Sequence, residues 1–170
     1  MKKIPYGSDW ERKTIKLPDV GIMIAPEIFR VTERVYFQSG RAVMEGAQYF
    51  DWQTAHRLVE SRNVPAGWRM MKLAEAERIK ELYDACRFGK LVLGHDGYVV
   101  PPNMVAYKYC PTGFGHYVAH RGITGCYWLD EDGCISTSTS ASLLEVSGLQ
   151  LKLTKYYMGY GLPLLLVKDI

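Results

Sequence analysis

At 170 residues, with 48% hydrophobic and 12% aromatic residues, the chain has the composition of one folded domain with its own core. The formal net charge is only +3 and the Lys and Arg residues form no basic stripe, so nucleic-acid binding is not expected. No apolar run approaches the roughly 20 residues of a membrane helix, and the N-terminus lacks the apolar stretch of a signal peptide. Neither membrane insertion nor classical export is therefore expected.

The chain is expected to divide into residues 1–20, an N-terminal arm or lead-in strand, and residues 21–170, a single domain. The first segment is polar, but Ile15 and Leu17 alternate with polar neighbours, as in a short strand at 13–17. Runs rich in β-branched and aromatic residues then predict strands at 21–25, 28–31 and 34–38, and a loop is expected at 44–49.

Residues 50–87 have the clearest period in the chain and predict two amphipathic helices joined by a bend at 63–68. Asp51 is the expected N-cap, because its carboxylate can accept the first free backbone N–H groups. The first helix must end before Pro65, and Asn63 is the expected residue with positive φ. The second helix is expected to end at Gly89, and its predicted apolar face consists of Leu73, Ala76, Ile79, Tyr83 and Cys86.

The second half predicts strands and long loops. Residues 91–100 form a hairpin pattern around 94–97, and residues 103–125 are rich in aromatics and glycines without a period, which predicts a surface excursion. A second hairpin is expected between 126–129 and 134–137, followed by a Ser/Thr-rich strand or loop at 136–142. Residues 149–154 alternate as a half-buried strand, 159–161 form a turn, and the apolar run 164–167 predicts a central strand. The predicted class is α+β.

The four cysteines are Cys86, Cys110, Cys126 and Cys134. Their spacing contains no CxxC pair and no zinc-finger pattern, and three disulfide connectivities remain open. Without a signal peptide, free and mostly buried thiols are expected.

Four motifs occur in the chain in this order: Phe50-Asp51-Trp52 with Ala55, then Pro65-Ala66-Gly67-Trp68-Arg69-Met70 with Glu75 and Ile79, Gly125-Cys126-Tyr127-Trp128, and Leu166-Val167-Lys168-Asp169. They resemble, in the same order, those of the Fibrobacter succinogenes major paralogous domain, a C-type-lectin-like family common in Bacteroidetes and their phages and related to phage tropism-determinant variable domains. The resemblance covers about residues 45–170. The departures are Met71-Lys72, where the family has Pro-Thr with its Thr N-cap, and Leu129-Asp130, where it has Ser-Ser or Ser-Thr.

The resemblance implies two helices packed on a mixed or antiparallel sheet that the N- and C-terminal strands close, with the binding surface on long loops at 95–145. Trp52, Trp68, Arg69 and Glu75 would be the structural signature. Arg69 is expected to make charge-assisted hydrogen bonds with Asp169 or Glu75.

Tyr and Trp combine an apolar ring with a hydrogen-bonding tip, so the aromatic and histidine side chains of the loops are the candidate ligand contacts. His116 and His120 lie four residues apart without further ligands at a metal-binding spacing, so they are expected to be loop histidines. The full set of candidate ligand-binding residues is Tyr107, Tyr109, Phe114, His116, Tyr117, His120, Tyr127 and Trp128.

No catalytic constellation and no cofactor motif is evident. The acidic turn of Asp130, Glu131 and Asp132 offers oxygen ligands for Ca²⁺, as in C-type lectins, although such a turn ending in Gly133 is also ordinary hairpin chemistry.

These patterns predict a non-enzymatic binding or structural module, either a phage virion component (a fibre or receptor-binding protein) or a surface adhesin exported by a non-classical route. Its expected partners are a glycan or protein receptor and further virion proteins or copies of itself. One alternative is a structural protein that assembles into an oligomer and binds no glycan. Another is a thiol-dependent enzyme of the formylglycine-generating superfold, whose cysteine pattern this chain does not match.

Overall fold

The N- and C-terminal parts of the chain meet in one four-stranded antiparallel sheet. Its strands lie in the order β1 (Ile15–Leu17), β2 (Ile22–Ile24), β13 (Leu166–Asp169) and β6 (Trp68–Met70). Because β13 pairs with β2 on one side and β6 on the other, the predicted central position of the C-terminal strand is confirmed. The predicted strand near residues 13–17 is also confirmed, as β1.

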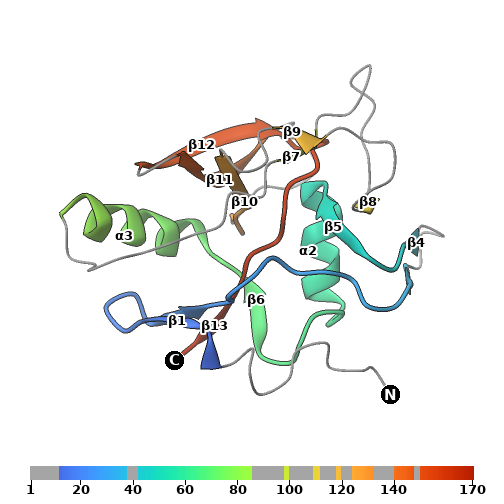
Figure 1. Ribbon diagram of the computed structural model, residues 1–170, viewed down its shortest axis with the longest axis horizontal. Coiled ribbons are helices and arrows are strands. Elements are labelled where there is room, and N and C mark those ends of the chain that lie inside the picture. Colours follow the sequence, from blue (N-terminus) through green and yellow to red (C-terminus); the bar gives the residue numbers. More distant parts are fainter. Residues whose placement is uncertain are drawn as a thin grey trace.

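The computed structural model describes residues 12–37, 42–85, 98–99, 109–111, 118–119, 124–131, 140–147 and 150–170; for 98–99, 109–111 and 118–119 it describes the backbone alone. Within these residues the class is α+β, as predicted, and every pair of strands is antiparallel. In Figure 1 the four-stranded sheet lies at the bottom of the view and a three-stranded sheet at the top.

The three-stranded sheet consists of β10 (Thr124–Trp128), β11 (Ser140–Ser147) and β12 (Gln150–Tyr157). The partner described for β10 is β11, with Trp128 opposite Leu143, whereas the predicted partner at 134–137 lies outside the described residues. The register places Leu144 opposite Leu153 on one face, and α3 packs against β11 and β12. The predicted half-buried strand at 149–154 is confirmed as part of β12.

The remaining strands form short pairs, and one of them corrects a prediction. Residues 44–49 were expected to be a loop, but β5 begins within them because its backbone finds distant partners: Phe50 exchanges hydrogen bonds of 3.0 and 2.9 Å with Leu162. Residues 28–31 are not a strand, although Phe29 and Val31 donate to the carbonyls of Leu164 and Ala47. The pairs are β3 (Val35–Tyr36) with β4 (Ala42–Val43), β5 (Ala47–Phe50) with β8 (Tyr109–Pro111), and β7 (Tyr98–Val99) with β9 (Val118–Ala119).

Helix α2 (Trp52–Glu60) begins as predicted, because Asp51 Oδ1 accepts the Thr54 N–H at 2.8 Å. Its end corrects the prediction by one residue: the positive φ, 59°, belongs to Arg62 and not to Asn63. The N–H groups of Arg62 and Asn63 donate to the carbonyls of Val59 and Leu58, which is the hydrogen-bond pattern of a Schellman motif. Ser61 is the C-cap of the helix, and Arg62 follows it in the left-handed conformation.

The predicted bend between the helices contains a strand, which corrects the expectation of a simple turn. Trp68 and Met70 are buried and Arg69 is half-buried between them, so the segment alternates as a strand does and pairs with β13. Helix α3 (Leu73–Asp84) then buries Ala76, Ile79 and Leu82, while Leu73 and Tyr83 are partly buried. Cys86 and Gly89 lie outside the described residues, and no described helix is long and apolar enough to cross a membrane.

The turn before β6 requires a glycine. Gly67 has φ of +86°, and the Trp68 N–H donates to the Pro65 carbonyl at 3.1 Å, which closes a turn of type II geometry. We expect Gly67→Ala to lower the free energy of unfolding by about 1–2 kcal/mol, because a side chain strains this conformation. An added Cβ would also lie 3.3 Å from Cε of Lys168. Urea unfolding tests this. Gly67→Asn, which tolerates positive φ better, should cost less, and equal stability of all three proteins would contradict the assignment.

Candidate functional site

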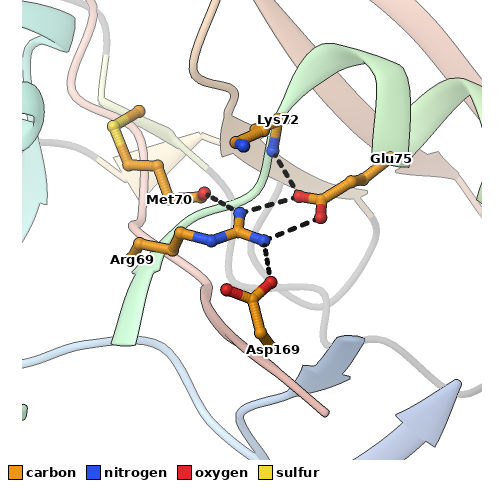
Figure 2. A network of polar contacts seen from close by, with 5 residues as sticks. All are labelled: Arg69, Met70, Lys72, Glu75 and Asp169. Carbon is orange, nitrogen blue, oxygen red and sulfur yellow. Dashed lines mark hydrogen bonds and ion pairs between the residues drawn. The ribbon is translucent and has the colours of Figure 1, made fainter. Parts of the chain in front are cut away.

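Arg69 lies at the centre of a charged network that joins three elements of the fold (Figure 2). From β6, its Nη1 donates to Oε1 of Glu75 at 2.8 Å, and its Nη2 donates to Oε2 at 2.7 Å. Nη2 also donates to Oδ1 of Asp169 on β13 at 2.7 Å. The paired contacts with Glu75 are the bidentate geometry in which guanidinium and carboxylate bind most strongly. The expectation that Arg69 contacts Asp169 or Glu75 is confirmed, with both carboxylates bound together.

Glu75 also begins helix α3. Its Oε1 accepts the backbone N–H of Lys72 at 2.9 Å, so the third residue of the helix binds back to the N-cap position. A carboxylate in the first turn also interacts favourably with the positive end of the helix dipole. This contact satisfies the Lys72 N–H, one of the free backbone donors at the start of the helix.

The network is charged at neutral pH because its groups favour their ionised forms. Hydrogen bonds to Glu75 and then to Asp169 raise the pKa of Arg69 above its ordinary value, against the opposing effect of burial. Burial acts to raise the pKa of Glu75, but hydrogen bonds from Arg69 and the Lys72 backbone outweigh it, so that pKa is lowered. The hydrogen bond from Arg69 also lowers the pKa of Asp169, whose side chain is 75% exposed.

The lowered carboxylate pKa values predict loss of stability in acid. In the folded protein the pKa of Glu75 lies below its reference value of 4.5, and that of Asp169 lies below 3.8. The ionised network therefore stabilises the fold fully at a pH above these reference values. The stabilisation is lost as the pH falls through the lowered pKa values of the folded protein. We expect the urea midpoint to fall between about pH 5 and about pH 2, and to fall less in Arg69→Met. Equal slopes in the two proteins would contradict this.

Most of the predicted ligand contacts fall outside the described residues. Tyr107, Phe114, His116, Tyr117 and His120 are among them. Tyr109 lies in β8, where the backbone pairs with Phe50 of β5. The proposed loop surface at 95–145 is therefore described only at β7, β8, β9, β10, residues 129–131 and the start of β11.

Tyr127 and Trp128 correct the prediction of an exposed aromatic platform. Tyr127 is 2% exposed and Trp128 is fully buried. The Trp128 indole N–H donates to the Phe50 carbonyl at 2.7 Å, which gives the ring's one polar group a partner inside the core. Both rings come from β10, whose residues are all buried, so both lie in the core and not on the surface.

Two residues of the predicted structural signature, Trp52 and Trp68, are buried in the core. The Trp52 indole N–H donates to the Leu129 carbonyl at 2.9 Å, and its ring stacks on His56 with centroids 4.9 Å apart. Trp68 is 6% exposed at the start of β6. Trp52 at the start of α2 and Trp68 at the start of β6 therefore anchor this segment in the core. Arg69 then connects β6 to α3 through Glu75 and to β13 through Asp169.

Asp130 and Glu131 of the acidic turn contact other parts of the fold. The Asp130 backbone donates to Met71 at 2.8 Å and accepts from Leu73 at 3.0 Å, which fixes this turn against the start of α3. Glu131 accepts the Ser142 hydroxyl at 2.7 Å and lies 3.8 Å from Lys155. Asp132 lies outside the described residues. Among those described, no group of three or more His, Cys, Asp or Glu side chains is placed to hold a metal ion, and Ca²⁺ binding stays a prediction.

Cys126 is a free, fully buried thiol, as expected for this cysteine. Burial, with a smaller contribution from the Glu145 charge, raises its pKa to about 12. The thiol is therefore protonated at neutral pH and is a poor nucleophile in the folded protein. Of the other cysteines, Cys86 and Cys134 lie outside the described residues and Cys110 is described by its backbone alone.

A cavity of about 530 Å³ was not predicted, although residues 65–68 of its lining belong to the segment that resembles the lectin-like motif. It is formed by residues 29 and 31–35, which precede and enter β3, together with Val59 and residues 62–68 between α2 and β6. The sequence carries only a weak signal for it, the charged residues at positions 33, 34 and 62 beside apolar neighbours. The two segments are about 30 positions apart in the chain, and only the fold brings them together.

Comparison with known proteins adds no assignment: no family model, no curated protein and no solved structure matches this chain.

Proposed function

We propose that this chain is a non-enzymatic binding module of the C-type-lectin-like fold, and that it serves in a phage virion as a fibre or receptor-binding protein. Its ligand is a glycan or a protein receptor, bound by the loops at 95–145. The alternatives are a surface adhesin with the same binding surface, and a structural protein whose loops bury against other subunits.

The observation that carries the proposal is the Arg69 network. The residues that resemble the lectin-like family's signature are the ones that connect β6, α3 and β13. The sheet formed by the N- and C-terminal strands closes the domain, as that fold requires. Such a scaffold leaves the second half of the chain to carry recognition, and the fold alone does not fix a function.

The non-enzymatic part of the proposal is supported by the chemistry of Cys126, the one cysteine whose side chain is described. Its protonated, fully buried thiol does not suit a nucleophile. The described carboxylates of the Arg69 network are engaged with a guanidinium and a helix start, which is a structural use of charge.

A glycan array probed with the full chain tests the proposal, with Tyr107→Ala/Tyr117→Ala as the loop variant. We expect specific glycan binding that this variant loses and that Tyr36→Ala keeps, since Tyr36 is an exposed tyrosine of β3, outside the loops. Binding that survives the loop variant would remove these two tyrosines from the site.

Light scattering separates the assembly alternative. A chain that binds no glycan and forms an oligomer dependent on residues 1–11 would support the structural protein instead. The truncation should stop at residue 11, because β1 pairs with β2 and its removal would damage the sheet.

A further inference from the structure

We propose that the cavity between residues 29–35 and 62–68 is a binding site for an uncharged small molecule that contains an aromatic ring. This site is separate from the loops at 95–145, and the inference does not depend on the function proposed above. It rests on the size of the cavity, the burial of its inner walls and the backbone hydrogen bonds that fix the two segments forming it.

The cavity is too large to be a packing defect. Its volume is about 530 Å³, whereas protein interiors contain few voids larger than a water molecule. It reaches the surface, because the exposed residues Ala66 and Gly67 line it together with buried ones. The volume falls in the range of small-molecule sites, and the exposed part of the lining gives such a molecule a way in.

The inner walls are apolar, and each segment contributes an aromatic ring. Phe29, Val31 and Trp68 line the cavity and are buried, with 4%, 2% and 6% of their surfaces exposed. Val59 and Val64 add partly buried aliphatic surface. An aromatic ligand would bury apolar surface against these side chains, and its ring would also gain the favourable edge and stacking contacts that aromatic pairs make.

Both walls are held by the same C-terminal segment. The Phe29 N–H donates to the Leu164 carbonyl at 2.9 Å, two residues before β13 begins. Trp68 opens β6, where it lies opposite Lys168 of β13, and its N–H closes the turn at Pro65. The cavity is therefore formed before a ligand binds, and binding does not have to order its walls.

The charges at the rim do not select a charged ligand. Three charged residues line the cavity and are exposed, the anionic Glu33 and the cationic Arg34 and Arg62. The rim thus carries both signs, and the two arginines also take part in other interactions of the fold. A charged group moved from water to the apolar walls would lose hydration without a partner there, which favours an uncharged ligand.

The test titrates three probes with the same ring system into ¹⁵N-labelled full chain: the neutral 2-naphthylmethanol, the anion 2-naphthoate and the cation 2-naphthylmethylammonium. We expect the alcohol to shift the amide signals of residues 29–35 and 62–68, except Pro65, and to bind at least about threefold more tightly than either ion. A charged probe that binds as tightly as the alcohol would overturn the uncharged class. Absence of shifts in these two segments would overturn the site.

Two further measurements test the aromatic class and the nature of the occupant. The saturated analogue decahydro-2-naphthylmethanol should bind about two- to fivefold more weakly than the aromatic alcohol, because it lacks the ring contacts. Equal affinity for the two alcohols would overturn the aromatic class. Shifts of the same amides that depend on protein concentration, without any probe, would assign the cavity to a second copy of the chain and overturn a small-molecule site.

A cavity-filling variant tests the position of the probe. Val64→Phe adds a ring to the lining and should weaken binding of 2-naphthylmethanol by about tenfold. Val20→Phe is the matched control, since Val20 is also partly buried against the core but does not line the cavity, and it should leave the affinity unchanged. Equal affinity of the two variants would overturn the site. If Val64→Phe does not fold, the probe comparison on the unaltered chain still decides the proposal.

Discussion

Arg69→Met is expected to lower the free energy of unfolding by about 2–3 kcal/mol, measured by urea unfolding at neutral pH. Removing the guanidinium leaves the Glu75 carboxylate, which is 15% exposed, without its bidentate partner. Loss of one member of a buried pair costs more than the pair contributes net, because a charge stays behind in a poorly solvated place. The value is set below that of a fully buried pair, since Arg69 is 22% exposed.

The controls separate this network from ordinary surface pairs. Arg78→Met removes an ion pair with Glu81 in which both side chains are well exposed, and should cost at most about 0.5 kcal/mol. Arg69→Met/Glu75→Met should be more stable than Arg69→Met alone, because the uncompensated carboxylate is gone. If Arg69→Met is no more destabilising than Arg78→Met, the network does not hold the three elements together.

Trp128→Ala is expected to lower the free energy of unfolding by about 3–5 kcal/mol, the cost of emptying a large core site. The ring is fully buried in β10, and its N–H donates to the Phe50 carbonyl. Trp128→Phe should cost less, about 1–2 kcal/mol, because an aromatic ring remains and the Phe50 carbonyl still accepts from Leu162. Urea unfolding measures both variants.

This series also decides between a core and a ligand-facing position for Trp128. Tyr36→Ala is the control, since Tyr36 is 70% exposed and its loss should change the free energy of unfolding by no more than about 0.5 kcal/mol. A Trp128→Ala protein as stable as Tyr36→Ala would return Trp128 to the candidate ligand surface. If Trp128→Ala does not fold, Trp128→Phe still gives a measurable difference.

Local patterns were sufficient where one segment supplies its own partners. The N-cap at Asp51 and the buried face of α2 follow from residue type and helical spacing. The two candidate partners of Arg69 were named from the motifs that resemble the lectin-like signature, one of which contains Glu75 and another Asp169. Glu75 and Asp169 both bind it, and only the structure shows that β6 places one guanidinium between them.

The predictions were wrong where a stretch of chain takes its structure from segments that are distant in the sequence. Residues 47–50 and 68–70 have weak local signals but become strands, because β8, Leu162 and β13 supply hydrogen bonds from far along the sequence. Tryptophan is a residue type that suits recognition surfaces, yet the side chain of Trp128 is fully buried in the fold. No period within a window of sequence carries information about such partners.

The sequence by itself determined the α+β class and the two helices, because helical period and capping depend on residues that are close in the chain. Only the tertiary structure decided which aromatic rings are buried and where a cavity forms, because burial depends on what the rest of the chain places over a residue. For the same reason the cavity that Arg34 and Arg62 flank could be found only after folding had brought its two segments together.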